Sequence, residues 1–98
     1  MESNIIYDFI QKNVSFLLPG VEFVVYELAD LSMYNRKFIV VINNEFKFDI
    51  VVNRYKLLSY SEQEFESIYD TINNEIDFYK NRFLKIRKIK NIINEKTL

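Results

Sequence analysis

The last third of the chain carries a regular apolar stripe. Between residues 61 and 94, apolar side chains recur three and four residues apart, at Phe65, Tyr69, Ile72, Ile76, Tyr79, Phe83, Ile86 and Ile93. That spacing is typical of one face of an amphipathic helix. Ser61 is a suitable N-cap, Glu64 occupies the capping-box position, and Tyr60 can staple to Phe65 across the cap. The sequence therefore predicts one long helix that begins at Ser61.

The upstream residues predict a helix and three strands. Apolar residues at helical spacing predict a helix over residues 4–14, and Pro19-Gly20 ends that region. Strands are predicted over residues 21–28, 37–42 and 45–53, with a two-residue type I′ turn at Asn43-Asn44. We therefore expect a single α+β domain over residues 1–98. Its order is α-β-β-β-α, with a three-stranded antiparallel sheet packed against the long C-terminal helix.

The two faces of the predicted sheet differ. In the third strand, Phe46, Phe48, Ile50 and Val52 face one way, while Glu45, Lys47 and Asp49 face the other. The first face should pack on the long helix. The predicted contacts join Tyr60, Phe65, Ile68, Ile72, Ile76 and Tyr79 to Phe46, Phe48, Ile50, Phe23 and Phe38. The first two strands also place apolar side chains on the opposite face, at Val24, Tyr26, Leu28, Ile39 and Val41. We expect the first helix to cover that face; otherwise it is a binding surface.

The long helix exceeds the length of the sheet. A strand of eight residues spans about 26 Å, whereas a helix of this length spans about 50 Å. Residues 79–98 must therefore project, pair with another chain, or fold back after a break near Asn73-Asn74 or Asn81. The apolar seam continues there through Phe83, Ile86, Ile89 and Ile93. This seam suggests a homodimer or a partner protein.

The composition argues against most catalytic chemistry. The chain contains no His and no Cys, so it lacks the commonest general base and the usual soft-metal ligands. We expect a protein that is not an enzyme and needs no metal or other cofactor. Glu45-Phe46-Lys47, with Asp30 upstream, resembles the Mg²⁺ site of restriction-type nucleases, so a Mg²⁺-dependent nuclease is a distant alternative.

Charge divides the chain into two parts. Residues 1–79 carry thirteen acidic and six basic side chains, a balance of −7, whereas residues 80–98 carry seven basic and one acidic, a balance of +6. The candidate acidic partner-binding surface comprises Glu22, Glu27, Asp30, Glu45, Asp49, Glu62, Glu66 and Asp70. The candidate nucleic-acid-binding or acidic-partner-binding segment comprises Lys80, Arg82, Lys85, Arg87, Lys88 and Lys90. Helix-dipole compensation alone also explains this polarity.

The order of the predicted elements resembles the double-stranded-RNA-binding domain. In that family the last helix begins with a basic cluster, whereas Glu62, Glu64 and Glu66 occupy that position here and would repel phosphate. A nucleic-acid-binding accessory protein that uses the basic helix is therefore the alternative, not the leading interpretation.

The size, composition and element order also resemble some phage-encoded inhibitors of bacterial defence systems and some toxin-immunity proteins. The resemblance implies a non-catalytic protein-binding module, encoded by a phage or mobile element, that inhibits a host protein or protein–nucleic-acid complex. The sequence shows neither a signal peptide nor a segment apolar enough to span a membrane, so we expect it in the (host) cytoplasm.

Overall fold

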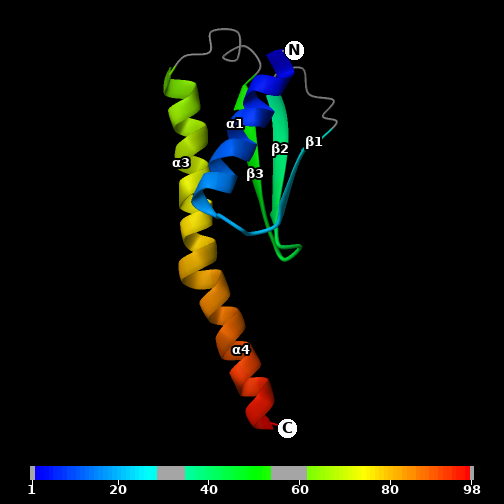
Figure 1. Ribbon diagram of the computed structural model, residues 1–98, viewed down its shortest axis with the longest axis vertical. Helices are drawn as coiled ribbons and strands as arrows, with labels where there is room; N and C mark the ends of the chain where they lie inside the picture. The colour runs from blue at the N-terminus through cyan, green and yellow to red at the C-terminus, as the bar shows by residue number, and fades with distance from the viewer. Residues whose placement is uncertain (1, 29–34, 54–61, 98) are drawn as a thin grey trace.

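The computed structural model describes residues 2–28, 35–53 and 62–97, with side chains for residues 5–28, 35–53 and 62–93. The elements are α1 (Glu2–Leu17), β1 (Phe23–Leu28), β2 (Asn35–Ile42), β3 (Phe46–Asn53), α3 (Glu62–Phe78), the π-helical segment η1 (Tyr79–Phe83) and α4 (Leu84–Thr97). Figure 1 shows their arrangement. This order confirms the predicted α-β-β-β-α layout. Ser61 and Tyr60, the predicted cap and staple, lie outside the described residues.

Helix α1 is longer than the predicted span of residues 4–14. Its apolar face is formed by Ile6, Ile10 and Val14, which are four residues apart and fully buried. The helix ends where the amide of Leu18 donates to the carbonyl of Val14 at 2.9 Å. Gly20 then adopts a φ of 77°, a backbone conformation that glycine accepts without steric cost, and the chain turns toward β1.

The three strands form an antiparallel sheet in the order β1-β2-β3. Asn43 and Asn44 have φ angles of 52° and 55°, as the predicted turn requires, and the Glu45 amide donates to the Ile42 carbonyl at 3.0 Å. However, Ile42 pairs with Phe46, so three residues separate the paired strands. The loop is thus one residue longer than predicted, and Glu45 belongs to the turn rather than to β3.

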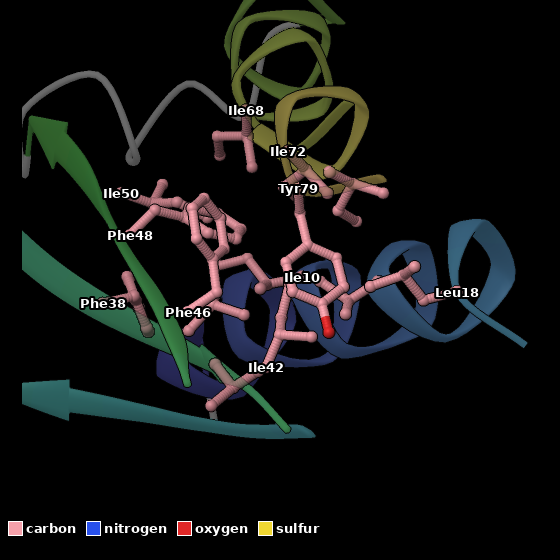
Figure 2. Close-up of a cluster of buried hydrophobic side chains, with 14 of the residues drawn as sticks. Ile10, Leu18, Phe38, Ile42, Phe46, Phe48, Ile50, Ile68, Ile72 and Tyr79 are labelled. Atoms are coloured by element: carbon pink, nitrogen blue, oxygen red, sulfur yellow. The ribbon is translucent and has the colours of Figure 1, made fainter. Parts of the chain in front are cut away.

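The core lies between one face of the sheet and the two helices α1 and α3. Ile68, Ile72, Ile76 and Tyr79 are buried in one cluster with Phe38, Phe46, Phe48 and Ile50, which confirms the predicted helix–sheet contact. Phe23 and Phe65 pack at its border, and Tyr60 lies outside the described residues. Tyr69 is absent from this cluster, because Ile68 turns inward in its place. Figure 2 shows side chains of α1, α3 and the sheet converging on this core.

The prediction that the first helix covers the second sheet face is wrong. The buried residues of α1 belong to the same cluster as those of α3, so both helices pack on one face. On the other face, Val24 is 52% and Val51 is 58% exposed, and Tyr26 and Leu28 are also exposed. Ile39 is buried there without joining the core cluster, since it sits on the central strand between Tyr26 and Asp49. The apolar second face therefore remains open in the described part of the chain.

The helix that begins at Glu62 runs without a break to Thr97. The alternative of a break near Asn73-Asn74 or Asn81 is wrong: the two asparagines lie inside α3, and Asn81 lies in η1. In η1 the Leu84 amide donates to the carbonyl of Tyr79, one residue further back than in an α-helix. α4 projects beyond the sheet (Figure 1), which gives the molecule extents of 56 × 27 × 19 Å. Among the described residues, no helix is long and apolar enough to cross a membrane.

Candidate protein-binding groove and basic extension

An open groove of about 540 Å³ lies between α1 and α3. Its lining residues are Phe9, Asn13, Glu62, Phe65, Glu66, Tyr69 and Asp70. The groove has a floor of aromatic rings: Phe9 and Phe65 meet edge to face, with ring centroids 4.9 Å apart. The side-chain amide of Asn13 donates to the Phe9 carbonyl at 2.8 Å, which fixes this side of the groove.

Helical spacing sets the charge of the groove. Glu62, Glu66 and Asp70 follow one another at intervals of four residues, so they form a row along α3. Phe65 and Tyr69 are also four residues apart and lie beside that row. Among the described residues, the lining contains three carboxylates and no basic side chain. The groove is therefore both apolar and negatively charged, which suits a ligand that carries positive charge on an apolar body.

The predicted acidic surface is only partly gathered in one place. Glu62, Glu66 and Asp70 line the groove, but the other described residues of that predicted surface lie elsewhere. Glu27 accepts two hydrogen bonds from Arg36, both at 2.7 Å. Asp49 forms an ion pair with Lys37 at 3.1 Å on the open sheet face. Glu22 is exposed just before β1, and Asp30 lies outside the described residues.

Sequence reasoning missed the α1 side of the groove. Neither Phe9 nor Asn13 was assigned a role in binding from the sequence. Their place in the groove follows from the contact between α1 and α3, two helices separated by the whole sheet in sequence. The available signal was the pair Phe65 and Tyr69, whose side of α3 also carries the three acidic residues.

Glu45 links the hairpin turn to the long helix. Its carboxylate accepts a hydrogen bond from the Tyr79 hydroxyl at 2.9 Å and one from the Arg87 guanidinium at 2.5 Å. Partial removal of Glu45 from water acts to raise its pKa, but the bonds from Tyr79 and Arg87 outweigh that effect and hold the pKa below the usual value for a glutamate. Burial and the neighbouring Glu45 carboxylate raise the pKa of Tyr79. The three side chains anchor the start of α4 to the sheet.

The π-helical segment places an aromatic cluster against the same hairpin. Its first and last residues, Tyr79 and Phe83, both contact Phe46, with ring centroids 5.3 Å and 5.2 Å away. Phe78 stacks on Phe46 at 5.9 Å. Packing around Phe46 thus fixes the direction in which the helix leaves the domain.

The structure separates the parts of the nuclease-like motif. Sequence alternation placed Glu45 on the face of Lys47; instead, Glu45 turns toward the helix because it belongs to the loop. Lys47 is exposed in β3 on the open face, and Asp30 lies outside the described residues. Within the described ranges, no group of three or more acidic side chains is arranged to hold a metal ion.

The extension beyond the domain is basic and apolar. Lys80, Arg82, Lys85, Lys88 and Lys90 are exposed, and Arg87 reaches back to Glu45. Ile86, Ile89, Ile92 and Ile93 are each at least half exposed. A smaller groove of about 190 Å³ at the root of the extension is lined by Phe78, Phe83, Ile86, Arg87 and Lys90. The predicted apolar seam of Phe83, Ile86, Ile89 and Ile93 is therefore largely open to solvent.

Comparison with known proteins assigns the chain to no family. No protein-family model matches it, and neither a curated protein nor a solved structure matches it significantly.

Proposed function

We propose that this protein is a non-catalytic protein-binding module whose groove between α1 and α3 takes a basic, partly apolar helix of another protein. One observation carries the proposal: three carboxylates and three aromatic rings line the same open depression. Carboxylates select lysine or arginine, and rings bury apolar stems and attract cations over their faces. The combination favours a cationic amphipathic segment over a small neutral molecule.

The dimensions of the groove suit a helix. Glu62 and Asp70 are eight residues apart, which corresponds to about 12 Å along α3, or roughly two helical turns. A docking helix would present two or three basic residues to the carboxylate row and its apolar stripe to Phe9, Phe65 and Tyr69. Such binding would inhibit a partner that uses the same basic helix to hold nucleic acid, which is the inhibitory role expected from the sequence.

The placement of the basic side chains on the extension does not favour direct nucleic-acid binding. Lys85 and Lys88 are three residues apart and share one side of α4, whereas Arg87 and Lys90 share another. The positive charge therefore surrounds the helix instead of forming the single stripe that follows a phosphate backbone. One of these cations, Arg87, is also engaged by Glu45.

A designed peptide pair tests the groove. The probe is a synthetic amphipathic helix of lysine and leucine; its counterpart has glutamate in place of every lysine. We expect only the lysine peptide to bind. The triple variant Glu62→Gln/Glu66→Gln/Asp70→Asn should bind it about tenfold more weakly, because three exposed ion pairs at about 0.5 kcal/mol each are lost. Isothermal titration calorimetry at low and high salt measures both affinities.

The matched control removes three acidic charges outside the groove, in the variant Glu22→Gln/Glu75→Gln/Asp77→Asn. The net charge changes equally, and the Asp77→Asn change keeps a side-chain oxygen that can accept the bond donated by Asn81. We expect this variant to bind the lysine peptide like the wild type. If both triple variants bind the peptide equally weakly, the attraction is nonspecific and the proposal is contradicted. Failure of the wild type to bind the lysine peptide would also contradict it.

A further inference from the structure

The exposed face of α4 is a second apolar surface for which the described residues provide no cover. Four isoleucines, Ile86, Ile89, Ile92 and Ile93, are each half exposed or more within two helical turns. The sheet ends before this part of the helix (Figure 1), so the domain's own core does not reach it. A surface of this kind on a small protein marks an interface.

The charges of the long helix indicate what the interface binds. α3 carries six acidic residues and no basic one: Glu62, Glu64, Glu66, Asp70, Glu75 and Asp77. The segments after it, η1 and α4, carry one acidic residue, Glu95, and seven basic residues: Lys80, Arg82, Lys85, Arg87, Lys88, Lys90 and Lys96. One continuous helix thus has two halves of equal and opposite charge.

The two halves also match in length. α3 has 17 residues and spans about 25 Å, while η1 and α4, with 5 and 14 residues, together span about 28 Å. When two such helices lie side by side in opposite directions, the acidic half of each lies along the basic half of the other. A single twofold axis then produces two identical contacts, and each contact joins helix halves of opposite charge and similar length.

We propose that two copies of this chain associate in this antiparallel way, with α4 of each copy lying along α3 and the groove of the other. Two other arrangements fit the charges less well. Parallel pairing places like charges together along the whole helix. Pairing of α4 with α4 alone would bury the isoleucines, but it would bring ten basic side chains together.

This association rests on the proposed function, since it assigns to the groove an occupant from the same protein. The second copy's α4 is itself a basic helix with an apolar face, the ligand class proposed above. In the dimer, the groove of each copy is consequently occupied by the other copy. A partner helix must compete with the second copy for the groove, which becomes accessible on dilution or when the partner helix binds more strongly.

A charge swap tests the arrangement. The groove variant is Glu62→Lys/Glu66→Lys/Asp70→Lys, and the tail variant is Lys85→Glu/Lys88→Glu/Lys90→Glu. Sedimentation equilibrium should give the wild type twice the 11.9 kDa chain mass, shifting toward one chain mass at high salt. Each variant alone should stay monomeric, because like charges then face each other in both contacts. An equimolar mixture should restore a dimer, since each contact again joins opposite charges.

The possible outcomes distinguish the antiparallel dimer from the proposed peptide-binding function. A wild type that is monomeric at all concentrations, a groove variant that still dimerises, or a mixture that stays monomeric overturns the antiparallel dimer. Circular dichroism of each variant verifies that it remains folded. The tail variant keeps an intact groove, so its binding of the lysine peptide reports on the proposed function separately. Peptide binding without dimerisation removes only this inference, whereas loss of peptide binding removes the proposed function itself.

Discussion

Replacement of Ile72 by aspartate is expected to unfold the protein. Ile72 is fully buried at the centre of α3, in the cluster that joins the helix to the sheet. A carboxylate there loses its hydration without gaining a partner, and the change also removes the apolar contacts of the isoleucine. The combined cost exceeds about 4 kcal/mol, which is a large share of the roughly 5–15 kcal/mol that stabilises a folded domain. Far-ultraviolet circular dichroism during urea titration measures the loss.

The same substitution at Ile89 provides the control. Ile89 lies on the same continuous helix but is 56% exposed, so Ile89→Asp should change the stability of the dilute monomer by only about 0.5 kcal/mol. It should also abolish self-association, because it places a charge in the apolar contact. Similar destabilisation by both substitutions would contradict the division of the helix into a core half and a projecting half.

Phe46→Ala is expected to cost about 3–5 kcal/mol. Phe46 contacts four other rings, Phe48, Phe78, Tyr79 and Phe83, with centroids between 5.2 and 6.2 Å away. Its removal leaves a cavity where the hairpin meets η1, and the surrounding backbone is too constrained to fill it. The midpoint of urea unfolding should fall accordingly, with little change in the denaturant slope.

Phe16→Ala removes the same group from a different environment. Phe16 is 76% exposed on α1, so its loss should leave the urea midpoint nearly unchanged. If Phe46→Ala were as mild as Phe16→Ala, the ring cluster would not be what fixes the long helix to the hairpin.

Local patterns predicted most of the fold. The spacing of Ile72, Ile76 and Tyr79 was enough to place the long helix against the sheet, because a helical stripe buries the face that it presents. The predicted stripe contained Tyr69 at the turn where Ile68 is buried instead. Alternation in β3 identified Phe46, Phe48 and Ile50 as its partners for the same reason. The Asn43-Asn44 turn was also predictable, since asparagine tolerates the left-handed backbone that the turn requires.

The features that were missed depend on contacts between distant segments. Helix α1 packs on the same sheet face as α3, and this placement depends on how the two helices fit beside each other. The prediction from the sequence placed α1 on the opposite face. The contribution of Phe9 and Asn13 to the groove follows from the same choice. One extra turn residue moved Glu45 from the solvent face of a strand to Tyr79 and Arg87, a change that alternation alone does not reveal. No spacing or residue pattern in the sequence predicted the π-helical segment.

The proposals for the groove and for the dimer share one requirement: the helix that closes the core must continue straight beyond it. The chain has no native cysteine, so spin labels attach only where cysteine is introduced. Ser67 and Asn91 are both exposed on the long helix and suit this labelling.

The most direct test is the distance between labels at Ser67→Cys and Asn91→Cys, measured by double electron–electron resonance with labelled protein diluted into unlabelled protein. A continuous helix predicts about 36 Å between these positions, at 1.5 Å per residue. A distance below about 20 Å, as expected for two helices folded against each other, would contradict the account, because the helix would then double back and cover its own isoleucines.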